Sequence, residues 1–118
     1  MEDFVQVTTT FPDERTAQRV ASCVVDERLA ACAQVLGPIS STYWWKGEVE
    51  QEQEWYCHLK TTLERLPALE SRIRGLHPYE VPEIIAVPIL HGDPKYLEWI
   101  EAEVKEGSAE AKPGSHGQ

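Results

Sequence analysis

The sequence contains few of the residues that would tie a small chain together covalently or carry it into a membrane. Its three cysteines, Cys23, Cys32 and Cys57, are odd in number and form no CxxC pair. This pattern argues against a disulfide framework and against a zinc knuckle. No run of about 20 apolar residues could cross a bilayer, and the start, Met1 to Phe4, lacks the basic segment of a signal peptide. We therefore expect a cytoplasmic protein with free thiols and no membrane partner.

Positive charge is also scarce in this chain. Eleven lysines and arginines stand against 20 acidic residues, which gives a formal net charge of −9. The basic residues are scattered, whereas a nucleic-acid binder concentrates them into a patch that meets the phosphates. We therefore expect no nucleic-acid partner. Excess carboxylate attracts divalent cations loosely, although such a surplus generally serves solubility.

The length of 118 residues fits one domain. The last residues, 107–118, contain no large apolar side chain and cannot offset the entropy lost on ordering. The sequence therefore predicts one domain over residues 1–106, followed by a tail over residues 107–118 without fixed structure of its own.

Local patterns predict seven secondary-structure elements. β-Branched residues favour strands, apolar residues spaced three and four apart favour helices, and the pair Lys46-Gly47 favours a turn. Pro12 and Asp93 suit the starts of helices. The expected elements are a strand over 4–10, a helix from residue 12, a strand over 29–45 interrupted at 37–38, a strand over 48–62, a helix over 67–76, a strand over 84–90 and a helix after residue 93.

The order of these elements predicts an α+β fold. Strand-helix-strand, repeated and followed by one more helix, is the pattern of a ferredoxin-like sandwich, in which helices cover one face of an antiparallel sheet. Residues 84–90 are apolar at both odd and even positions, and so is much of 29–36. Both faces of the sheet are therefore expected to be shielded from water. We predict that assembly covers the face that the helices leave open.

Several motifs together resemble one family. They are Thr10-Phe-Pro-Asp-Glu14, Leu29-Ala-Ala-Cys32, Tyr43-Trp-Trp-Lys-Gly47, Lys60-Thr61, His77-Pro-Tyr-Glu-Val-Pro-Glu83 and Tyr96-Leu-Glu-Trp99. In this order and at these separations they resemble the CutA family of divalent-cation tolerance proteins, over about residues 4 to 104. The resemblance implies a βαββαβ protomer with a C-terminal helix, which forms a homotrimer similar in architecture to the PII signalling proteins. It also implies a role in divalent-cation tolerance, with copper binding in some members.

Cys32 and His77 stand at positions that match the family and could supply a thiolate and an imidazole to copper or zinc. Two donors do not close a site, and Thr8 to Thr10 and Leu76 stand where copper-binding relatives can carry a further cysteine and histidine. We therefore expect Cu²⁺ or another divalent cation to bind weakly. His77 should contribute more than Cys32, because burial in an apolar strand opposes thiolate formation. The alternatives are that Cys32 is a small buried hydrophobe and that His77 holds its loop.

A second set of residues predicts a ligand or subunit cleft. Strand alternation places Glu54 and Lys60 on one face of their strand. A lysine near the middle of a sheet needs a carboxylate or an anion if it is buried. An ion pair across the trimer interface and a PII-like site for an anion or small molecule are therefore the alternatives. The residues expected at the cleft are Trp45, Glu54, Lys60, Tyr79, Glu80, Tyr96 and Trp99.

The sequence offers little for catalysis. Cys32 with His77 is the candidate pair of nucleophile and base. No oxyanion-hole, P-loop or glycine-rich signature accompanies the pair. We therefore expect a protein that is not an enzyme.

Overall fold

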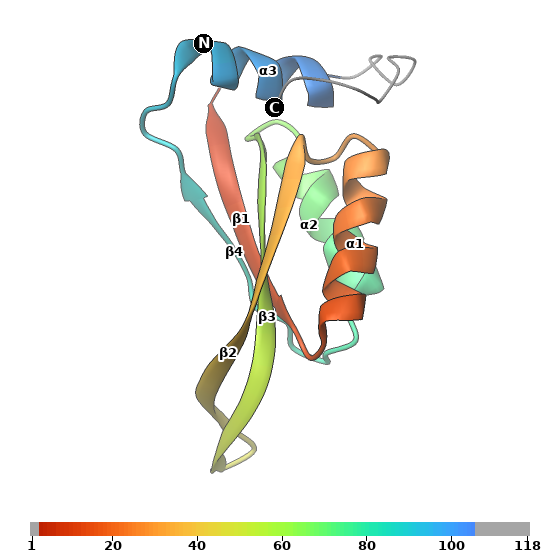
Figure 1. The fold of residues 1–118 in the computed structure, drawn as a ribbon, viewed down its shortest axis with the longest axis vertical. Helices are drawn as coiled ribbons and strands as arrows, with labels where there is room; N and C mark the ends of the chain where they lie inside the picture. Colours follow the sequence, from red (N-terminus) through yellow and green to blue (C-terminus); the bar gives the residue numbers. More distant parts are fainter. Residues whose placement is uncertain (1–2, 106–118) are drawn as a thin grey trace.

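The computed structural model describes residues 3–105, and the expected tail over residues 107–118 lies outside them. The four strands form one sheet in the order β2-β3-β1-β4, and each neighbouring pair is antiparallel. Helices α1 and α2 cover one face, and α3 lies across one end (Figure 1). This confirms the predicted α+β, ferredoxin-like class. The elements are β1 (Phe4–Phe11), α1 (Glu14–Asp26), β2 (Cys32–Trp45), β3 (Glu48–Thr62), α2 (Leu66–Leu76), β4 (Ile84–Pro88) and α3 (Pro94–Val104).

Side-chain caps start two of the helices. The Asp13 carboxylate accepts the backbone N–H of Thr16 at 2.7 Å, so Asp13 is the N-cap of α1. Pro12, where the helix was predicted to begin, therefore lies just before the cap. Asp93 caps α3 in the same way, and Pro94 occupies the first helical turn as predicted. Within the described residues, no helix has the length and apolar character needed to span a bilayer.

The core fills the space between the sheet and the two helices on its face. Alternate residues of β1 and β3 point toward α1 and α2, and the side chains that meet there are almost fully buried. A smaller cluster joins α3 to the end of the sheet through Phe4, Ala31, Ile100 and Val104. The main cluster includes Val5, Val7, Phe11, Ala17, Val20, Val24, Cys57, Leu59, Leu69 and Ile73.

Strands β2 and β3 continue past the rest of the sheet as a two-stranded hairpin. β1 pairs with β3 only as far as Trp55, so residues 39–45 and 48–54 pair only with each other. We call residues 39–54 the arm; it extends beyond the helices in Figure 1. Lys46 and Gly47 turn its tip with φ of 50° and 86°, which two-residue hairpin turns require. At its base the register shifts between Leu36 and Ile39.

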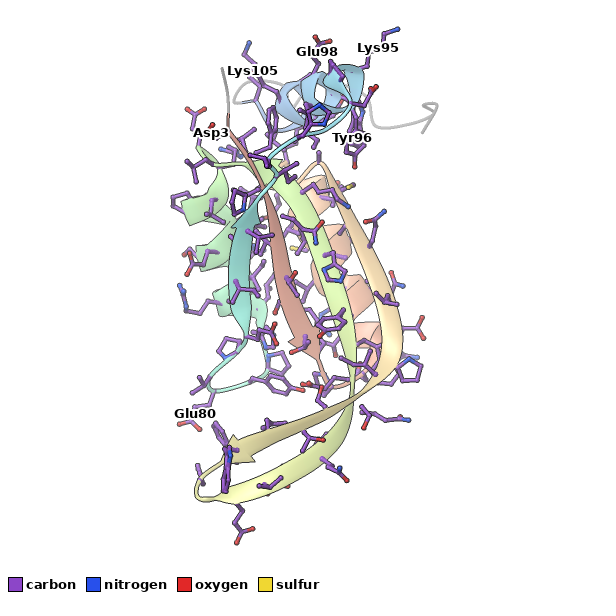
Figure 2. The ribbon with its side chains drawn as sticks, turned by 90° about the vertical axis from the view of Figure 1, so that its left-hand side faces the viewer. Asp3, Glu80, Lys95, Tyr96, Glu98 and Lys105 are labelled. Atoms are coloured by element: carbon purple, nitrogen blue, oxygen red, sulfur yellow. The ribbon has the colours of Figure 1, made fainter. Side chains whose placement is uncertain are left out.

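The face of the sheet opposite α1 and α2 carries no covering element among the described residues; it faces the viewer in Figure 2. Leu36, Ile85 and Val87 on it are 54%, 52% and 48% exposed. We call this surface the open face. By register and alternation it comprises Gln6, Thr8, Cys32, Gln34, Leu36, Tyr56, His58, Lys60, Ile85 and Val87.

Candidate functional site

Both ring nitrogens of His77 take part in hydrogen bonds, which hold the ring at the end of α2. Its Nδ1 accepts the backbone N–H of Tyr79 at 3.2 Å, and its Nε2 lies 3.1 Å from Thr9 Oγ1. The neutral ring therefore carries its proton on Nε2. The ring also stacks on Phe11, with centroids 4.4 Å apart. Burial lowers the pKa of His77, although a hydrogen bond to the Thr10 backbone and the Glu54 charge oppose the shift.

Tyr79 connects the loop after α2 to the base of the arm. Its hydroxyl donates to Glu54 Oε2 at 2.6 Å, and Glu54 is only 7% exposed. Burial first, and then the Glu54 carboxylate, raise the pKa of Tyr79. The hydroxyl therefore remains a donor to a buried carboxylate at physiological pH.

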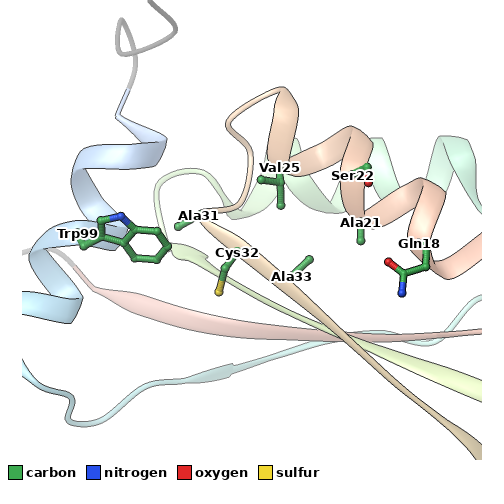
Figure 3. Close-up of a pocket in the computed structure, with 8 residues that line it drawn as sticks. All are labelled: Gln18, Ala21, Ser22, Val25, Ala31, Cys32, Ala33 and Trp99. Carbon is green, nitrogen blue, oxygen red and sulfur yellow. The ribbon is translucent and has the colours of Figure 1, made fainter. Parts of the chain in front are cut away.

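Cys32 lies at the other end of the sheet, beneath α3. Its Sγ is 3.5 Å from Tyr96 Oη, and Tyr96 stacks on Trp99. Burial, together with the neighbouring thiol, raises the pKa of Tyr96 to about 12. Cys32 lines a hollow of about 350 Å³ between α1, the start of β2 and Trp99. Figure 3 shows its thiol directed away from α1.

Lys60 lies on the open face, one strand away from Cys32. Its Nζ donates to Gln34 Oε1 at 2.6 Å. Glu54, the acidic residue expected with it, lies six residues along the same strand and bonds Tyr79 instead. Within one protomer, Lys60 and Glu54 therefore do not form an ion pair.

The sheet separates the two predicted metal donors. Cys32 is in register with Lys60 on the open face, whereas His77 contacts Thr9 and Phe11 on the helix-covered side. The two side chains therefore do not fit a shared metal ion or a nucleophile–base pair within one protomer. Across residues 3–105, no group of three or more histidine, cysteine, aspartate or glutamate side chains could hold a metal ion.

The other predicted cleft residues fall at both ends of the molecule. Trp45 is 37% exposed on the arm, with Lys46 Nζ 5.5 Å from the centre of its ring. Glu80 is exposed in the loop toward which the arm curls (Figure 2). Tyr96 and Trp99 lie on α3, at the opposite end from the arm. One protomer thus brings together Glu54 with Tyr79, and Tyr96 with Trp99, but not the whole set.

One polar cluster was missed by the sequence analysis. Cys23 Sγ donates to Glu27 Oε2 at 3.2 Å, and Arg72 Nη2 donates to the same sulfur at 3.3 Å. The spacing of four residues between Cys23 on α1 and Glu27, the C-cap of that helix, could have indicated this pair. Arg72 comes from α2, and no local pattern places it there. All three cysteines are free, and burial raises the pKa of the Cys57 thiol to about 12.

Fold and surfaces together define a class: a ferredoxin-like protein with a protruding arm, a sheet face that no element of residues 3–105 covers, and candidate metal ligands distributed over both faces. The family model "CutA1 divalent ion tolerance protein" matches residues 5–103. The chain belongs to this family.

Curated relatives support the assignment. A divalent-cation tolerance protein CutA from Thermus thermophilus is 44% identical over 100 residues, covering 85% of this chain and 95% of the relative. The CutA structure from Xylella fastidiosa superposes with a TM-score of 0.85 at 40% identity, covering 87% of this chain and 99% of that one. A structure from Archaeoglobus fulgidus, described as a periplasmic divalent cation tolerance protein CutA, superposes with a TM-score of 0.82 at 32% identity, covering 89% of this chain and 100% of that one.

The lowered pKa of His77 predicts a pH dependence of stability. The unfolded chain binds a proton near the reference pKa of about 6.5, above the folded value. The stabilisation is therefore complete above that pH and is lost as pH falls through it toward the folded pKa. Melting of the wild type should decline between pH 7.5 and 5.5 more steeply than melting of His77→Gln, which cannot titrate. An NMR titration placing the His77 pKa at or above 6.5 would contradict this.

Proposed function

We propose that this chain acts as a cytoplasmic homotrimer in divalent-cation tolerance, without catalysing a reaction. The observation that carries the assembly is the open face, where Leu36, Ile85 and Val87 are each about half exposed. Ile85 and Val87 lie at one edge of this face and Leu36 lies at the other, with mostly polar side chains on the two strands between them. Exposed apolar side chains on a sheet face are typical of protein interfaces. The tolerance role rests on family membership, and the unpaired thiols suit a reducing compartment.

The edges of the sheet support the same assembly. β2 and β4 are the two edge strands, so each has one neighbour in the described protomer. Residues 32–36 of β2 and residues 84–88 of β4 are stretches of equal length. A second copy could extend the sheet at either edge, and head-to-tail contacts of this kind close into a ring. The arm, with Trp44 74% exposed, would reach toward the neighbouring copy.

The geometry favours weak cation binding. Copper at His77 would have to displace the hydrogen bonds to Thr9 and Tyr79. Cys32 would have to lose its thiol proton beside Tyr96, and within residues 3–105 it belongs to no group of three or more histidine, cysteine or carboxylate side chains that could hold a metal ion. The net charge of −9 attracts divalent cations without fixing them at one position.

A second candidate function is recognition of a small anion. Lys60 is partly buried on the open face, and its hydrogen bond goes to an amide and not to a carboxylate. Assembly through this face would bury the ammonium group further, and a buried charge needs a counter-charge. A carboxylate from a neighbouring copy would meet that need as well as a bound anion.

For the assembly, we expect sedimentation to give three times the 13.4 kDa mass of one chain. Replacing Ile85→Glu and Val87→Glu together should yield single chains, because charges would stand where apolar side chains pack. Ala68→Glu, on the exposed side of α2, is the matched control and should leave the mass unchanged. A wild type that sediments as one chain would refute the homotrimer.

For the cation, calorimetric titration of Cu²⁺ at neutral pH should show weak binding. The losses caused by Cys32→Ser and His77→Ala should add in the double variant, because the sheet keeps the two side chains apart. Cys23→Ser, a thiol on α1, serves as the control. Tight binding that either single substitution abolishes would instead indicate a site shared between neighbouring copies.

For the anion, inorganic phosphate is the probe. If Lys60 binds an anion, phosphate should raise the melting temperature of the wild type and not that of Lys60→Met, because a ligand stabilises only the state that binds it. If phosphate changed the melting temperatures of the two proteins equally, Lys60 would not bind the anion, and its role would be an ion pair with a neighbouring copy.

A further inference from the structure

The arm has little within the protomer to fix its direction. Residues 39–54 form a two-stranded hairpin beside which the described part of the chain places no third strand, and such hairpins are marginally stable alone. The register irregularity between Leu36 and Ile39 lies where the arm leaves the sheet. A break in the ladder at this point removes backbone pairing that would hold the arm in line with the body.

Glu54 lies directly beyond this irregularity. It pairs with Ile39, the first pair of the arm, and its carboxylate accepts the Tyr79 hydroxyl at 2.6 Å. A short hydrogen bond to a charged acceptor is among the stronger polar contacts in proteins. Because Glu54 is 7% exposed, losing the donor would leave a carboxylate buried without that partner.

Tyr79 is itself anchored to the body. Its backbone N–H donates to His77 Nδ1, and the His77 ring stacks on Phe11 at the end of β1. Phe11 is fully buried in the main core. A continuous series of contacts therefore runs from the core through His77 and Tyr79 to Glu54 at the base of the arm.

We propose that Tyr79 is a positioning residue for assembly: its hydrogen bond to Glu54 sets the direction in which the arm leaves the sheet. The arm then presents Trp44 and Val49, 74% and 55% exposed, to a second copy of the chain. In Figure 2 the arm curls toward the side on which Glu80 lies, as expected if the loop after α2 guides it. This inference rests on the proposed homotrimer, since a lone protomer has no use for an oriented arm.

The test is Tyr79→Phe in the full chain, which removes one hydroxyl and keeps the ring. Backbone amides of residues 39–54 should exchange with deuterium about tenfold faster, since losing a hydrogen bond to a charged group changes an opening equilibrium by roughly that factor. Amides of α1 should exchange at the wild-type rate. The trimer should also dissociate at a protein concentration about tenfold higher.

Matched variants separate positioning from general destabilisation. Tyr43→Phe removes an arm hydroxyl for which no hydrogen bond is found within residues 3–105 and whose interaction with Glu54 and Tyr79 is only electrostatic, so it should change both measurements far less. Glu54→Gln keeps an acceptor and should retain part of the effect of the bond. Glu54→Leu should behave like Tyr79→Phe, and combining the two should add nothing further.

Two outcomes would overturn the inference. The first is that Tyr79→Phe exchanges its arm amides at the same rate as the wild type and that its trimer dissociates at the same protein concentration. The second is equal acceleration of arm and α1 amides, which would indicate loss of stability throughout the fold. If the wild type proves monomeric, the proposed homotrimer fails separately, while the exchange comparison still decides whether Tyr79 holds the arm.

Discussion

One constraint shapes the rest of the structure: the helices α1 and α2 both cover the same face of the sheet. Helices α1 and α2 bury one set of alternating side chains, whereas α3 packs across the end through Ile100 and Val104. Arg28 strengthens that placement with a 2.7 Å ion pair to Glu103. The third helix is thereby committed to the end of the sheet, so no element within residues 3–105 covers the open face, and we propose that other copies of the chain do. The arm continues this open face beyond the body of the sheet.

This arrangement also decides what one protomer can do chemically. The sheet lies between Cys32 and His77, so their donor atoms cannot converge without a second copy. Both nitrogens of His77 already serve the fold, and Lys60 contacts an amide. In the proposed homotrimer, ligand chemistry would therefore depend on what neighbouring copies bring to these side chains, and a role in cation tolerance would belong to the assembly.

Local signals predicted most of the fold, because caps, turns and alternation act within a few residues. Asp93 and the Lys46-Gly47 turn are examples. The candidate site was harder to predict from the sequence. Counting back from the turn would place Gln34 opposite Leu59, but the irregularity after Leu36 moves it opposite His58 and onto the face of Lys60. The contact of His77 with Thr9 joins residues 68 apart, which no spacing rule anticipates.

The central claim is that assembly completes the open face, and a crystal structure of the assembled protein tests it most directly. We predict three protomers around one axis, with Leu36, Ile85 and Val87 buried between them and each arm resting on a neighbouring copy. A structure in which these three side chains stay exposed to solvent, or in which the copies meet through α1 and α2, would contradict the account.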